Sequence, residues 1–206
     1  MEDHPSEKPR RKIEDLLWQL LTVTAGVLIA LSLEGAVEWS HQRTMVSEAK
    51  DNLRQEMLNN KREIERTLAS LPKLKINLQT AILFIGDLQA HRANGEGTVK
   101  LDYTYYSGLL SATGWSAAQA AGVLAHMPYG DVRKYAEIYD TERRFAADQQ
   151  RLAEAVAAAV PSNDIDNSNP RELRDWERRV QASLAYLQKV DGLARGLKSD
   201  YEEALR

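Results

Sequence analysis

The feature that most constrains this chain is an uncharged, apolar run from Leu16 to Leu33. Its polar residues can be satisfied within a helix, because short hydroxyls bond to the carbonyl one turn earlier. They are Gln19, Thr22, Thr24 and Ser32. As a helix the run measures about 27 Å, close to the thickness of a bilayer's hydrocarbon core. Trp18 and Trp39 bracket it, and indoles favour membrane interfaces. The run predicts a transmembrane helix over residues 16–37.

Two alternative interpretations of this run remain open. A cleaved signal peptide shares the basic flank before it, which comprises Lys8, Arg10, Arg11 and Lys12. The apolar run is longer than a typical signal-peptide core, however, and no small-x-small cleavage site follows it. The other alternative is a fully buried core helix of a soluble protein. Length and flanks favour the anchor over both.

The flanking charges predict the orientation of this anchor. Four Lys or Arg side chains lie just before it, whereas only Arg43 and Lys50 lie within a similar distance after it. Because basic residues are retained on the cytoplasmic side, residues 1–15 are predicted to be a short cytoplasmic tail. Residues 38–206 then form an extracytoplasmic domain.

One face of the predicted anchor carries small residues at steps of four. These are Thr22, Gly26 and Ala30, and Glu34 follows in the same register. Small residues at this spacing let a second helix approach closely, so the face predicts self-association in the membrane. Chance is the alternative, because small residues are common in membrane spans. Glu34 is expected at the outer boundary of the bilayer.

Beyond Trp39 the apolar residues recur at helical spacing, and no strand pattern is present. The first amphipathic stripe extends from Leu53 to Leu88, and we expect Pro72 to introduce a kink or a short break in it. Its heptad comprises Met57, Ile64, Leu71, Leu78 and Ile85, and Leu53, Leu68, Leu74, Ile82 and Leu88 fall in the intervening turns. The Gly- and Asn-containing segment His91–Thr98 is predicted to be a loop.

Three further helices are predicted. Ser116 followed by Gln119 fits a capping box, so a short helix is expected to start at Ser116 and end before Pro128. A long helix is expected from Asp131 to Val160, with an apolar face of Val132, Tyr135, Tyr139, Ala146, Leu152, Val156 and Val160. After a loop at 161–169, the last helix is expected to begin at Pro170, with Asn169 as its N-cap. Its stripe contains Leu173, Trp176, Val180, Leu184, Leu187, Ala194, Leu197, Tyr201 and Leu205.

Long helices with single apolar faces must bury those faces against one another. The fold class predicted is therefore all-α: an N-terminal transmembrane helix continuing into a long-helix, up-and-down bundle with short inserted helices. The heptads also suit a coiled coil, so the same faces can be buried between protomers.

Four segments resemble a set of uncharacterised bacterial single-pass membrane proteins with a signal anchor and an extracytoplasmic helical domain. They are LIALSLEGAVEWSHQR (28–43), EAKDNLRQEMLNNKREIERTL (48–68), WSAAQAAGVLAHMPY (115–129) and LKSDYEEAL (197–205). The resemblance implies topology, fold and a bacterial inner (plasma) membrane location, with no catalytic residues. The chain departs from that pattern at Glu34, Gly35 and Ala36, which bears on where the span ends.

The sequence contains no convincing catalytic, cofactor or metal site. It has no cysteine, and the four histidines are too scattered for a metal pair on one helix face. Gly114-Trp115-Ser116 lacks the second glycine of a nucleophile elbow. An acidic run from Asp164 to Asp175 fails three requirements of a calcium loop. We expect no enzymatic activity and no cofactor.

Charge argues against one class of partner. Lys and Arg total 27 against 30 Asp and Glu, a net charge of −3, so no nucleic-acid binding is expected. The charge-rich segments Arg54–Arg66 and Arg171–Arg179 are predicted to be solvated helix faces.

One aromatic patch is explained least by bundle packing. It comprises Tyr103, Tyr105, Tyr106, Trp115 and Tyr129, whose rings offer apolar area with polar tips. We hypothesise a ligand or partner site there, with ordinary packing as the alternative. The leading functional hypothesis is a membrane-anchored bundle, in contact with membrane lipid, that forms a homo-oligomer or binds a protein partner. The alternative is an extracytoplasmic small-molecule sensor that acts through a partner.

Overall fold

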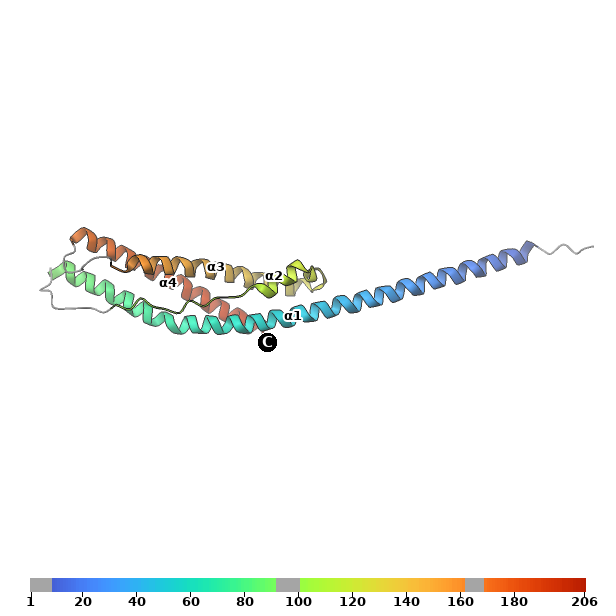
Figure 1. Ribbon diagram of the computed structural model, residues 1–206, viewed down its shortest axis with the longest axis horizontal. Helices are drawn as coiled ribbons and strands as arrows, with labels where there is room; N and C mark the ends of the chain where they lie inside the picture. The colour runs from blue at the N-terminus through green and yellow to red at the C-terminus, as the bar shows by residue number, and fades with distance from the viewer. Residues whose placement is uncertain (1–8, 92–100, 162–168) are drawn as a thin grey trace, which may run out of the picture. The chain divides into compact units, whose positions relative to one another are not determined.

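The structure is a computed structural model that describes residues 9–91, 101–161 and 169–206. Its elements are α1 (Pro9–His91), α2 (Thr113–Ala120), the 3-10 helix η1 (Val123–His126), α3 (Tyr129–Ala159) and α4 (Pro170–Ala204) (Figure 1). No strand occurs within these three ranges, which confirms the all-α prediction. Residues 1–8 of the predicted tail, and most of the predicted loops at 91–98 and 161–169, lie outside the described residues.

The chain divides into two compact units, Met1–Glu48 and Ala49–Arg206, and each is described by itself. In the first unit α1 begins at Pro9, before the apolar run, and every side chain from Leu16 to Leu33 is exposed. Within the described residues α1 is the one helix long and apolar enough to cross a membrane, and none of its apolar window is buried. A core helix of a soluble bundle would be buried, so that alternative does not fit.

Two hydroxyls of the apolar run are satisfied inside their own helix. Thr22 Oγ1 donates to the carbonyl of Trp18 at 2.8 Å, and Ser32 Oγ donates to the carbonyl of Leu28 at 2.7 Å. Beyond the run, the Arg43 guanidinium lies 5.3 Å from the centroid of the Trp39 ring, a cation–π contact.

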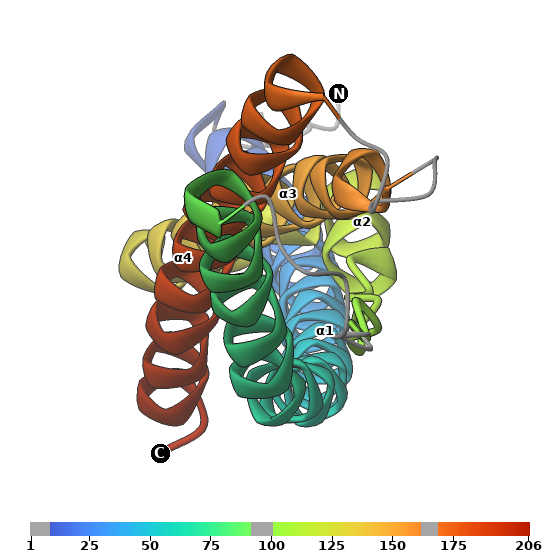
Figure 2. The same cartoon turned by 90° about the vertical axis from the view of Figure 1, so that its left-hand side faces the viewer.

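The second unit is a three-helix bundle with one extended segment. α1 and α3 run in the same direction, because Lys50 contacts Asp131 and Asn60 contacts Glu142. α4 runs opposite to both, and the three helices lie side by side (Figure 2). The extended segment, Leu101–Ala112, returns along α1 and takes the place that a fourth helix has in an up-and-down bundle.

The core of the second unit is built from the predicted stripes. All five α1 heptad residues, from Met57 to Ile85, are buried at 2% exposure or less. Seven residues of the predicted α4 stripe are also buried: Leu173, Trp176, Val180, Leu187, Ala194, Leu197 and Tyr201. The chain stays helical through Pro72, which is exposed, so the predicted break is absent.

The predicted face of α3 is partly wrong. Ala146 is exposed and Val160 is 50% exposed, whereas Phe145 is fully buried. The observed stripe alternates steps of four and three: Ile138, Glu142, Phe145, Gln149, Leu152, Val156 and Ala159. Because two of these core positions carry polar side chains, the apolar pattern alone misplaced the phase of the helix.

The start of α4 was predicted correctly from its own capping residues. The Asn169 side chain accepts from the backbone N–H groups of Arg171 and Glu172, and Glu172 completes a capping box. α3 begins at Tyr129, two residues before the predicted start, directly after Pro128. Gly122 adopts φ 69° between α2 and η1, a left-handed conformation that glycine accommodates without strain.

Candidate functional site

In the second unit, polar side chains of α1 form hydrogen bonds with the backbone of the extended segment. Four α1 residues make these hydrogen bonds: Asn60, Thr67, Ser70 and Asn77. Asn77 Nδ2 donates to the Asp102 carbonyl at 2.5 Å, and Ser70 Oγ accepts from the Tyr106 N–H at 3.0 Å. The segment has no strand partner among the described residues, so these side chains satisfy backbone groups that a sheet would otherwise pair.

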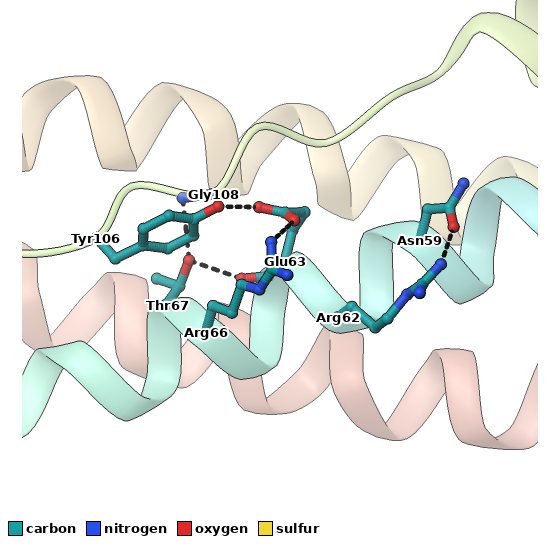
Figure 3. Close-up of polar contacts among 7 residues, drawn as sticks. All are labelled: Asn59, Arg62, Glu63, Arg66, Thr67, Tyr106 and Gly108. Carbon is teal, nitrogen blue, oxygen red and sulfur yellow. Dashed lines mark hydrogen bonds and ion pairs between the residues drawn. The ribbon is translucent and has the colours of Figure 1, made fainter.

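Gly108 marks the closest approach between the segment and α1 (Figure 3). Its N–H donates to Thr67 Oγ1 at 3.1 Å, and Thr67 in turn donates to the Glu63 carbonyl at 3.0 Å. A Cβ on Gly108 would lie 2.8 Å from that carbonyl oxygen and from Thr67 Oγ1, so only glycine fits. Tyr106 covers this contact, since its hydroxyl donates to the Glu63 carboxylate, which also pairs with Arg66 (Figure 3).

Glu56 of α1 caps the N-terminus of α2. Its carboxylate accepts from the Gly114 N–H at 2.8 Å and the Trp115 N–H at 3.4 Å, and from Ser111 Oγ at 2.8 Å. The residue at the N-cap position itself, Ala112, supplies no side-chain bond. The predicted Ser116 cap is therefore wrong: α2 starts at Thr113, because its orphan N–H groups are satisfied by a carboxylate from another helix.

A buried carboxylate cluster joins α1, α3 and α4 next to this cap. We define it as Glu56, Asn60, Tyr139, Glu142 and Tyr201. Tyr139 donates its hydroxyl to Glu56 at 2.6 Å, and Tyr201 donates its hydroxyl to Glu142 at 2.6 Å. Asn60 Nδ2 donates to Glu142 at 3.1 Å, so Glu142 is held from both α1 and α4. Glu142 is only 4% exposed.

Burial dominates the ionisation of this cluster. It raises the pKa of Glu142 to about 7, a shift that hydrogen bonds from Tyr201 and Asn60 oppose and the Glu56 charge reinforces. Burial also raises the pKa of both tyrosines, and the carboxylate that each one contacts raises it further. Burial therefore favours the protonated form of Glu142 over the ionised form.

The structure separates the five residues of the predicted aromatic patch. Trp115 is 6% exposed and stacks on Tyr139, with ring centroids 5.3 Å apart. Tyr103 and Tyr105 pack against the core, and burial raises the pKa of Tyr103 to about 12. Tyr106 is 41% exposed and Tyr129 is 80% exposed. The patch is divided between core packing, the Glu63 contact and open surface.

The predicted association face lies in the first unit. Thr22, Gly26, Ala30 and Glu34 are all exposed, and nothing lies within 4 Å of where a Cβ on Gly26 would stand. The small-residue face is thus exposed along its length.

The charge-rich segment Arg54–Arg66 is only partly solvated, contrary to the prediction. Arg54, Arg62 and Arg66 are exposed, but Asn60 is 1% exposed and Glu56 is part-buried as the α2 cap. The available signal was spacing, since Glu56, Asn60, Glu63, Thr67 and Ser70 follow steps of four and three beside the apolar stripe. Between Arg171 and Arg179 all four arginines are exposed, as predicted.

Comparisons with known proteins find no matching family model, curated protein or solved structure. Across the described ranges, no group of three or more His, Cys, Asp and Glu side chains converges to hold a metal ion. The carboxylate cluster joins α1, α3 and α4 by hydrogen bonds between side chains.

Proposed function

We propose that this protein is a single-pass protein of the bacterial inner membrane. Its helical bundle lies outside the cytoplasm and associates with a second copy or with a protein partner. It acts as an anchored interaction module and not as an enzyme. The segments at 28–43, 48–68, 115–129 and 197–205 support membership of the bacterial signal-anchor proteins that they resemble.

The observation that carries the proposal is the complete exposure of the apolar run. An 18-residue apolar window of α1 has no buried residue, whereas residues from Leu53 onward pack a core of their own. Leaving this much apolar surface in water is unfavourable, at about 25 cal/mol per Å². A bilayer removes that cost, and the self-satisfied Thr22 and Ser32 hydroxyls suit a hydrocarbon environment.

The charge distribution supports the orientation. Arg10, Arg11 and Lys12 precede the apolar run, and basic residues there favour retention on the cytoplasmic side. The N-terminus is therefore proposed to be cytoplasmic and the bundle extracytoplasmic. A reporter fused after Arg206 that is active only outside the cytoplasm measures this directly. Activity of a cytoplasm-specific reporter at the same position contradicts the orientation.

Self-association is supported by the exposed Gly26 face. Because the chain has no cysteine, single cysteines introduced into the full-length protein report unambiguously. Gly26→Cys and Ala30→Cys are expected to form cross-linked dimers in membranes. Leu28→Cys is the matched control, since two residues rotate the side chain by about 200° around the helix. Equal cross-linking at the three positions, or none, argues against this face.

A second pair of variants tests the same face by steric exclusion. Gly26→Ile is expected to shift the protein from dimer to monomer in detergent. Gly35→Ile is expected to have no such effect, because nine residues place it about 180° from Gly26. A strictly monomeric wild-type protein with no co-purifying partner would overturn the proposal of an interaction module.

The sensor alternative has less support. It depends on the five aromatic residues lining one ligand site, yet their exposed fractions include 6% for Trp115 and 80% for Tyr129. Stacking on Tyr139 also fills the space beside the Trp115 indole.

A further inference from the structure

Glu142 occupies a core position where three helices meet. It receives hydrogen bonds from Tyr201 on α4 and from Asn60 on α1. The orientation of the Asn60 amide is fixed, because its Oδ1 accepts from the Ser111 N–H at 2.9 Å and its Nδ2 also donates to the Ser111 carbonyl at 2.7 Å. One carboxyl group thus connects α3 to α1, to α4 and, through Asn60, to the extended segment.

The charged groups around Glu142 do not neutralise it. From α1 it faces Glu56, a second carboxylate, which raises its pKa. From α3 and α4 the facing titratable groups are the tyrosines Tyr139 and Tyr201. Across the described residues, no salt bridge to Glu142 is formed.

Two lysines on α1 and α4 are partly exposed and pair with other carboxylates. Lys61 pairs with Glu202 at 3.2 Å, and Lys198 pairs with Glu65 at 3.6 Å. Both lysine side chains keep more than a quarter of their surface exposed. A carboxylate that is buried without a cation carries a larger desolvation cost than the protonated acid.

We propose that Glu142 is a proton-operated clasp: the protonated carboxyl group holds α1, α3 and α4 together, and release of its proton to water loosens the C-terminal end of α4 and the extended segment. This inference is independent of the membrane anchor. It gives the bundle a response to the pH of the compartment that surrounds it.

The direction of the pH effect follows from the shift in pKa, from 4.5 to about 7. Between these two values the folded protein holds a proton that the unfolded chain has released. Stability is therefore greatest at and below about pH 4.5 as far as this group is concerned, falls as pH rises, and levels off above about pH 7. A shift of this size changes the unfolding equilibrium on the order of a hundredfold.

The first experiment measures chemical unfolding of the full-length protein in detergent micelles at pH 5.5 and pH 8. Glu142→Gln is a neutral isostere that keeps the hydrogen-bonding shape. Glu154→Gln is the matched control, an exposed glutamate on the same helix. Between pH 5.5 and pH 8 the unfolding equilibrium constant is expected to rise at least tenfold more in the wild type and in the control than in Glu142→Gln. An unchanged pH dependence in Glu142→Gln overturns the clasp.

A second measurement needs no substitution and keeps the test decisive if Glu142→Gln fails to fold. Carbon-detected NMR of labelled glutamate carboxyl groups reports the titration of Glu142 in the wild-type chain. A midpoint near 7 supports the proposal, and a midpoint near 4.5 overturns it.

Hydrogen exchange, corrected for intrinsic rates, is expected to increase at residues 194–204 and 101–112 between pH 6 and pH 8. Equal protection there at both pH values refutes the loosening.

Discussion

The two parts of α1 differ in how their polar side chains are satisfied. Within Leu16–Leu33 the surface is exposed and uncharged all round, and the Thr22 and Ser32 hydroxyls donate to carbonyls one turn earlier in the same helix. From Leu53 onward one stripe is buried, and polar residues such as Asn60 bond to a segment 51 residues away in sequence. A helix whose polar groups all bond within the helix is compatible with lipid. A helix whose side chains bond to other segments is part of a folded domain.

The largest effect expected from this comparison is on core packing. Leu78→Ala removes a side chain with 0% exposure and should destabilise the bundle by about 3 kcal/mol. Leu28→Ala is the matched change in the apolar run, where Leu28 is 59% exposed, and should leave bundle unfolding unchanged. Chemical denaturation followed by circular dichroism measures both. Comparable losses would show that the two regions are not energetically distinct.

A smaller effect is expected from the cross-helix cap. Glu56→Ala leaves the Gly114 N–H and the Tyr139 and Ser111 hydroxyls without their acceptor, and should cost about 2 kcal/mol. Glu38→Ala removes an exposed carboxylate whose hydrogen bond, to Gln42, is local, and should change stability by less than about 0.5 kcal/mol. The same denaturation assay compares them. Hydrogen exchange across residues 113–120 should rise in Glu56→Ala alone, and unchanged protection there contradicts the cap.

The smallest effect concerns glycine. Gly108→Ala forces a Cβ against the Glu63 carbonyl and should destabilise by about 1–2 kcal/mol. Gly86→Ala lies in the last two turns of α1, where a Cβ meets nothing within 4 Å, and should instead stabilise by about 0.5–1 kcal/mol. Opposite signs in the shift of the unfolding midpoint are the measurement. A loss of stability in Gly86→Ala would contradict the helix-propensity gain, and unchanged stability in Gly108→Ala would contradict the close approach.

The sequence alone predicted what depends on neighbours a few residues apart. Apolar spacing identified the stripes of α1 and α4, and Asn169 with Glu172 identified the start of α4, because helix periodicity and local caps are short-range. The phase of α3 was misplaced because Glu142 and Gln149 occupy core positions, and periodicity cannot distinguish a buried polar residue from an exposed one.

The candidate site could be predicted only in part, for a different reason. Tyr139 and Tyr201 were recognised as core residues, but their bonds to Glu56 and Glu142 join residues 83 and 59 positions apart. No local pattern reports such partners. The Ser116 cap was wrong for the same reason, since Glu56 reaches α2 from another helix.

The amino-acid sequence by itself determined the helices, the uncharged run from Leu16 to Leu33 and the faces that must be buried. The tertiary structure alone decided that an extended segment replaces a fourth helix, that Gly108 must be glycine and that Glu142 is enclosed beside a second carboxylate. Hydrophobic periodicity is a property of neighbouring residues, whereas the satisfaction of buried polar groups depends on which distant segments meet.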